Sequence, residues 1–283
     1  MDGSKKIIIE SWPYKFQIID NKLFSRDNTQ IYIRNFKIGG TYPDCVNVSV
    51  IYENNKPSDA TMRILFSDSD SSLNIPLEKD GGAVIMIKTL LQYVYSQLPT
   101  LTHIKFDDKT YMLCSTCKPI SLCHFSMAFN GQTWYEKYFN AKLNDDVKYQ
   151  QYRTKVSEFL YSTEFKTKMP FDKFVSFIDK REEEMTEIYG YYSDANTFND
   201  FFQSIPKQHR CRLVGSWIER FMKIILNNAF SNEDWVIPFP LEMSGCITPT
   251  GNKNKKTRKY YCPKGIITNN FPSKNICISP DEL

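Results

Sequence analysis

The feature that most constrains the fold is a change of hydrophobic period at the glycine pair Gly81-Gly82. Before this pair, short runs rich in Ile, Val, Tyr and Phe are separated by turn residues, which is typical of β-strands. We predict strands over residues 6–12, 15–19, 30–38, 46–52, 60–66 and 73–77. After the pair, apolar residues recur at helical spacing over 83–98, Pro99 ends that pattern, and a strand-like run follows over 101–106. This order predicts a βαβ unit whose two strands are parallel.

The rest of the chain begins with a second strand pair and continues mainly with helical patterns. We predict strands over 110–113 and 120–129, and helices over 147–161, 171–189, 195–202 and 208–228. From residue 232 onward prolines and glycines are frequent, which indicates an extended tail. The sequence therefore predicts an α+β fold. It comprises a β-rich domain (1–143) with a mixed, largely antiparallel sheet and a packed helix, a mostly helical region (144–231) and an extended basic C-terminal tail (232–283).

Composition places the chain among globular proteins and suggests where it acts. Of the 283 residues, 41% are hydrophobic and 24% are charged, which argues against gross disorder. The net charge of +4 is too small to indicate a nucleic-acid coat by itself. Because we find no signal-peptide core and no membrane-spanning run, we expect an intracellular protein, in the cytoplasm or a virion, with reduced cysteines. The abundance of Lys, Asn, Ile, Tyr and Phe suits an AT-rich genome, such as that of a large DNA virus.

The segment from Glu78 to Ala83 has the composition of an anion-binding loop. The first amides of a helix lack intrahelical partners, and the helix dipole favours negative charge there. Glycines allow a tight turn and let a phosphate approach the backbone closely. The turn before the predicted helix is therefore a candidate phosphate-binding element.

At this point the chain resembles the GNAT superfamily, the acetyl-CoA-dependent N-acetyltransferases. Their cofactor loop, Gln/Arg-x-x-Gly-x-Gly/Ala, is similar to Glu78-x-x-Gly81-x-Ala83, and their Leu-Tyr-x-Lys-x-Gly-Phe helix is similar to 134–139. The resemblance implies that acetyl-CoA is the cofactor and that Tyr135 protonates the leaving thiolate of CoA. It also implies that four backbone amides hold the pyrophosphate, those of Gly81, Gly82, Ala83 and Val84.

The chain departs from the family pattern in both motifs. Glu78 stands where the family has Gln or Arg, and together with Asp80 it places two carboxylates beside the expected pyrophosphate. Phe139 stands where the family has glycine. By residue type alone, Glu53 and Glu78 are the candidate catalytic bases. The resemblance therefore predicts an acetyltransferase fold that is either active or degenerate.

Two further groups of residues suggest binding sites. Cys114 and Cys117 form a CxxC pair close to Cys123, but no matching second CxxC follows, and Cys123 and His124 would point to opposite faces of the predicted strand. We therefore assign no metal. Basic residues cluster in 253–259, which is typical either of a phosphate-contacting arm or of a solvated loop. They are Lys253, Lys255, Lys256, Arg258 and Lys259.

Three functions are compatible with these patterns. The leading interpretation is a viral structural or interaction protein built on an acetyltransferase-like fold, because the catalytic inventory is poor and a fold does not carry an activity with it. Residues 125–143 also resemble uncharacterised proteins of large cytoplasmic DNA viruses. The alternatives are an active GNAT-type enzyme that uses acetyl-CoA and a nucleic-acid-binding factor that uses 253–259. We expect protein partners, or nucleic acid through that stretch, and no membrane insertion.

Overall fold

The computed structural model describes residues 5–11, 14–24, 31–40, 45–64, 82–108, 110–112, 119–178, 182–226 and 234–241. Contacts between residues divide the chain into two compact units. The described part of the first unit comprises residues up to Phe106 and residues 237–241, and the second unit runs from Asp107 to Val236. These boundaries differ from the predicted ones at 143 and 231, and most of the predicted tail lies outside the described residues.

The first unit contains a sheet whose strands follow one another along the chain. The strands are β1 (Lys5–Ser11), β2 (Tyr14–Phe24), β3 (Ile31–Gly39), β4 (Val46–Glu53), β5 (Lys56–Ile64) and β6 (His103–Phe106). Neighbours from β1 to β5 are antiparallel, whereas β5 and β6 are parallel and are connected through helix α1 (Gly82–Gln97). The predicted helix and the strand after it are confirmed as α1 and β6, and the strand parallel to β6 is β5. The predicted strand over 73–77 lies outside the described residues.

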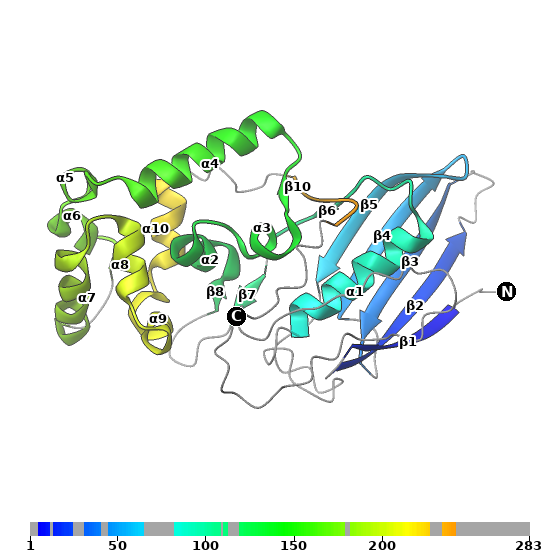
Figure 1. Ribbon diagram of the computed structural model, residues 1–283, viewed down its shortest axis with the longest axis horizontal. Coiled ribbons are helices and arrows are strands. Elements are labelled where there is room, and N and C mark those ends of the chain that lie inside the picture. The colour runs from blue at the N-terminus through cyan, green and yellow to red at the C-terminus, as the bar shows by residue number, and fades with distance from the viewer. Residues whose placement is uncertain are drawn as a thin grey trace, which may run out of the picture. The chain divides into compact units, whose positions relative to one another are not determined.

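Alternation along the strands determines which face of this sheet α1 covers. In β2 to β5 the buried apolar side chains occupy even-numbered positions: Phe16, Ile18, Phe36, Ile38, Val46, Val48, Val50, Tyr52, Ala60 and Met62. The helix lies across the strands (Figure 1), and its Tyr93 ring contacts Phe36 edge-on at 6.0 Å between ring centroids. Met86, Ile87, Leu90, Leu91 and Val94 of α1 are also buried. Period-two strands and a 3.6-period helix thus share one core.

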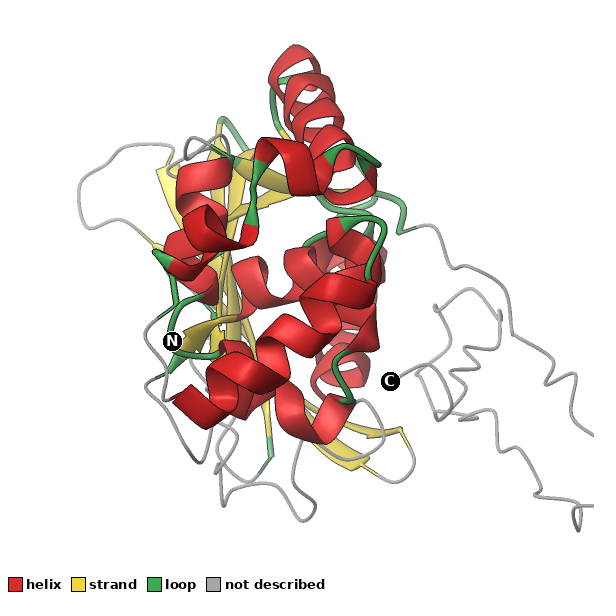
Figure 2. Ribbon diagram, turned by 90° about the vertical axis from the view of Figure 1, so that its left-hand side faces the viewer, coloured by secondary structure: helices red, strands yellow, loops and turns green. Residues whose placement is uncertain are grey.

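The second unit consists mainly of short helices (Figure 2). They are α2 (Leu122–Asn130), α3 (Trp134–Phe139), α4 (Asp146–Tyr161), α5 (Phe165–Lys168), α6 (Phe171–Val175), α7 (Glu182–Asp194), α8 (Phe198–Ser204), α9 (Lys207–Val214) and α10 (Ile218–Ile225). The short strands β7 (Tyr111–Met112) and β8 (Ile120–Ser121) pair with each other. The core of this unit is aromatic and is centred on Phe174, whose ring contacts those of Tyr192, Phe198, Phe201, Trp217 and Phe221.

The hydrogen-bonded order of the main sheet is β1-β2-β3-β4-β5-β6-β10-β9, with β9 (Lys142–Leu143) antiparallel to β10 (Trp235–Pro238). The sheet is mixed and mostly antiparallel, so the predicted α+β class is confirmed. None of the described helices is both long and apolar enough to cross a bilayer.

Several predicted elements were wrong in type or extent. The strand predicted over 120–129 ends at Ser121, and the residues after it form α2, which is buried on several sides and therefore shows no single apolar face. The helix predicted over 208–228 is divided, because α9 ends at Val214 and α10 starts only at Ile218. The helix predicted over 171–189 is likewise divided into α6 and α7.

Candidate functional site

The predicted cofactor amides lie at the start of α1. The helix begins at Gly82, so Gly82, Ala83 and Val84 form its first turn, while Gly81 and the loop before it lie outside the described residues. Gly82 and Val84 are buried, and Ala83 is partly exposed. No acidic residue occurs in this first turn. The amides there lack intrahelical acceptors, so the described part of this site fits an anionic group.

The two predicted catalytic residues have very different surroundings. Glu53 is exposed at the end of β4, opposite Lys56 across the β4–β5 hairpin. Tyr135 is only 1% exposed, and its hydroxyl lies 3.0 Å from the Thr110 hydroxyl. Burial, with the nearby charge of Asp108, raises the pKa of Tyr135, which therefore stays protonated. The proposed catalytic roles of Glu53 and Tyr135 remain predictions.

A carboxylate that the motifs do not include, Asp108, joins Tyr135 in one polar cluster. Asp108 follows β6 by two residues and accepts hydrogen bonds from the Thr110 backbone N–H and the Cys123 thiol. The Thr110 carbonyl accepts the backbone N–H of Leu122 at 2.9 Å, which fixes the start of α2 beside it. The loop after β6 and the first turns of α2 and α3 therefore converge on the Asp108 cluster, defined as Asp108, Thr110, Cys123 and Tyr135.

Electrostatics in the Asp108 cluster favour the neutral acid. Burial raises the pKa of Asp108 to about 7, and the charges of Asp107 and Glu136 act in the same direction. One carboxyl oxygen, Oδ1, is buried and receives no hydrogen bond from any described residue. Burial and the charge of Asp108 also raise the pKa of Cys123, which is therefore a thiol rather than a thiolate. Asp108 is thus a group that can exchange a proton near neutral pH.

Substituting Asp108 by asparagine should remove one source of pH-dependent stability. The folded-state pKa of about 7 lies above the ordinary value of 3.8, so the wild-type protein is most stable where Asp108 is protonated and loses this contribution as pH rises through 7. Between pH 5 and pH 8 the wild type should therefore lose on the order of 2 kcal/mol more unfolding free energy than Asp108→Asn. Urea denaturation at both pH values measures the difference. Equal pH dependence in the two proteins would contradict the raised pKa.

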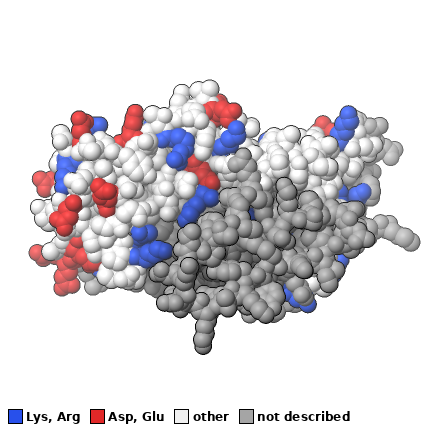
Figure 3. Space-filling view, viewed as in Figure 1, with Lys and Arg blue, Asp and Glu red and all other residues white. Residues whose placement is uncertain are grey.

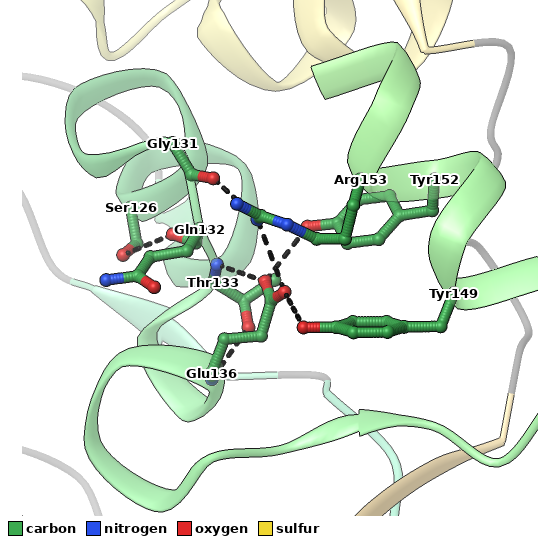
Figure 4. A network of polar contacts seen from close by, with 8 residues as sticks. All are labelled: Ser126, Gly131, Gln132, Thr133, Glu136, Tyr149, Tyr152 and Arg153. Carbon is green, nitrogen blue, oxygen red and sulfur yellow. Dashed lines mark hydrogen bonds and ion pairs between the residues drawn. The ribbon is translucent and has the colours of Figure 1, made fainter. Parts of the chain in front are cut away.

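A second buried carboxylate, Glu136, is fully engaged in structural contacts (Figure 4). Its Oε2 accepts the Thr133 backbone N–H at 2.7 Å and the Tyr152 hydroxyl at 3.0 Å. Its Oε1 accepts the Tyr149 hydroxyl at 3.0 Å and lies 3.4 Å from the Arg153 guanidinium. With the Thr133 hydroxyl accepting the Glu136 amide, this is a capping box at the start of α3, and it ties α3 to α4.

The remaining predicted binding residues either have structural contacts or lie outside the described residues. Cys123 and His124 are consecutive residues of α2, so the argument from opposite faces of a strand was wrong. His124 Nδ1 lies 2.7 Å from the Ser121 hydroxyl, and burial lowers the pKa of His124 to about 4. Cys114, Cys117 and the basic stretch 253–259 are not among the described residues.

Charged side chains of both signs are interspersed over the face of the second unit seen in Figure 3. Among the described residues of the second unit, ion pairs join Arg212 to Glu187 at 2.7 Å and Lys223 to Glu219 at 2.6 Å. Such exposed pairs contribute little to stability.

The sequence gives only a weak indication that Asp108 is unusual. The pair Asp107-Asp108 follows a buried strand directly, but it has the composition of an ordinary surface turn. The polar surroundings of Asp108 include Cys123 and Tyr135, which are distant from it in the sequence. Comparisons with protein-family models, curated proteins and solved structures found no match to this chain.

Proposed function

We propose that the protein is a GNAT-like acetyltransferase that binds acetyl-CoA at the first turn of α1. The observation that carries this proposal is the parallel pair β5 and β6, connected through a helix that begins at Gly82. The resemblance to the superfamily places a glycine turn directly before such a helix, and Gly81-Gly82 has this position in the sequence, whereas residues 65–81 lie outside the described residues. The first-turn amides supply donors for phosphate oxygens, and the helix dipole adds a favourable field.

The chemical part of the proposal follows the resemblance. Bound acetyl-CoA would supply an activated acetyl thioester, and an amine that takes the acetyl group must lose a proton. Tyr135 is protonated near neutral pH and is the predicted donor to the CoA sulfur. Glu53 and Glu78 remain the predicted proton acceptors by residue type.

Calorimetric titration with acetyl-CoA tests the proposal, with Ala83→Glu as the informative variant. The helix dipole stabilises a carboxylate in the first turn of a helix, so this variant should fold normally. The same carboxylate should repel a bound pyrophosphate. We expect micromolar affinity for the wild type, on the order of the affinity common for cofactors, and a loss of at least about tenfold in Ala83→Glu.

The matched control is Gln97→Glu, at the opposite end of α1. It adds the same charge far from the proposed pyrophosphate and should leave the affinity unchanged. Circular dichroism and thermal melting establish that every variant is folded. Absence of heat and of thermal stabilisation at millimolar acetyl-CoA would contradict the proposed function.

A second candidate function is that of a structural or interaction protein. The observation that favours it is an apolar strand, β1, at the edge of the main sheet. Self-assembly of a chain that has no affinity for acetyl-CoA would select this function over the first.

A further inference from the structure

The strand β1 has the features of a self-pairing edge. Within the sheet that the described residues form, β1 hydrogen bonds to β2 alone. Its centre is the apolar run Ile7 to Ile9, and Ile8 is 51% exposed on the face of the sheet away from α1. An edge strand presents a row of backbone N–H and C=O groups that another strand can extend. An edge strand with an apolar centre can therefore pair with a further strand.

We propose that β1 pairs in antiparallel fashion with β1 of a second copy of this chain, around a two-fold axis at Ile8. In this register Ile8 lies opposite Ile8, and Ile7 lies opposite Ile9. Lys6 lies opposite the position of Glu10, and Lys5 lies opposite the position of Ser11. All seven residues of the strand are paired, and the two sheets become one continuous sheet.

Charge selects this register over the alternatives. An axis at Ile8 pairs the position of Lys6 with that of Glu10 at both ends of the strand pair, and residues of unlike charge at paired positions favour such a register. Parallel pairing would instead place Lys6 beside Lys6. A shift of the antiparallel register by one residue would join the α1-covered face of one sheet to the uncovered face of the other.

Lysines on an edge strand more often prevent association, because a second copy meets like charge. In the proposed register this effect is reduced, because Lys6 lies opposite the position of Glu10 and Lys5 lies opposite that of Ser11, so neither lysine lies opposite a lysine. A seven-residue strand pair buries less surface than a standard interface. We therefore expect a weak dimer with a dissociation constant of roughly 10–100 µM.

Substitutions that reverse the charges of β1 test the register. The dissociation constant of each full-length variant is measured by sedimentation equilibrium. Glu10 also lies opposite Lys15 of β2, so the charges of these two positions are exchanged together. Lys6→Glu alone and Glu10→Lys/Lys15→Glu should each create two like-charge pairs across the dimer and weaken it at least about tenfold. The combined variant of all three substitutions restores unlike pairs and should return to within about threefold of the wild-type constant. A wild-type chain that stays monomeric at millimolar concentration would overturn the proposal, and so would a combined variant as weak as the other two.

A cysteine cross-link tests the position of the axis independently. Two copies of Ile8→Cys would lie directly opposite each other and should form a disulfide dimer under mild oxidation. In Lys5→Cys the two new thiols would be about 20 Å apart, so this variant should cross-link no more than the wild type, whose own cysteines set the background. Cross-linking at residue 5 but not at residue 8 would rule out the proposed register.

Discussion

Replacing Arg34 by methionine is expected to lower the free energy of unfolding by about 3–5 kcal/mol, because it leaves a buried carboxylate without its counter-charge. Arg34 forms two hydrogen bonds with Asp20, at 2.8 and 2.6 Å, and the Tyr93 hydroxyl of α1 donates to the same carboxylate at 3.1 Å. Asp20 is only 5% exposed. Burial opposes the charge of Arg34, but Asp20 outweighs this effect and raises the pKa of Arg34. The ion pair therefore joins β2, β3 and α1 in one core.

The double variant Asp20→Asn/Arg34→Met separates this explanation from a general packing defect. Removing both charges should cost clearly less than the sum of the two single substitutions, since no uncompensated charge remains. Lys22→Met is the matched control, because Lys22 is exposed and lies opposite Arg34 in the strand register. It should change stability by less than about 0.5 kcal/mol. Additive losses in urea denaturation would contradict the buried-pair account.

Glu136→Gln is expected to destabilise the protein by about 2–4 kcal/mol, although the two side chains have nearly the same shape. The carboxylate accepts hydrogen bonds from Thr133, Tyr149 and Tyr152, and it also neutralises Arg153. A glutamine amide has only one oxygen, and its NH₂ group would face donors. The substitution therefore leaves buried donors unpaired and Arg153 without its counter-charge.

Tyr149→Phe is the control for the Glu136 network. It removes one donor to the carboxylate and keeps the charge pair with Arg153, so a loss of only about 0.5–1.5 kcal/mol is expected. Thermal and urea unfolding of both variants measure the contrast. If Glu136→Gln were no more damaging than Tyr149→Phe, the carboxylate would not be the centre of the contacts between α3 and α4.

The strands and α1 could be predicted because one face of the sheet is buried. In β4 the burial alternates strictly from Val46 to Tyr52, so the period-two signal is strong, and the change to helical period at Gly82 marks α1. The segment Leu122 to Asn130 could not be assigned in this way. It is buried on several sides and carries β-prone residues such as Cys123 and Phe125, so its periodicity does not distinguish a helix from a strand.

The polar clusters could not be predicted, because their members are distant in the sequence. In the sequence, Glu136 is one residue of the stretch that resembles a family helix, and its contacts with Tyr149 and Tyr152 depend on how α4 packs. Asp108 gains its raised pKa from burial, and its partner Cys123 lies 15 positions later in the sequence. A local sequence pattern shows neither contacts between distant residues nor the burial of a single carboxylate. Helix starts and the buried face of a strand, in contrast, are visible in the local pattern.

Binding of acetyl-CoA at the start of α1 is tested most directly by amide hydrogen exchange with and without saturating acetyl-CoA. We expect slower exchange for the backbone amides of Gly82, Ala83 and Val84, because phosphate oxygens would accept their hydrogen bonds. The amides near Gln97 should exchange at an unchanged rate. Exchange that is unaffected at residues 82–84 in the presence of saturating acetyl-CoA would contradict binding at this site.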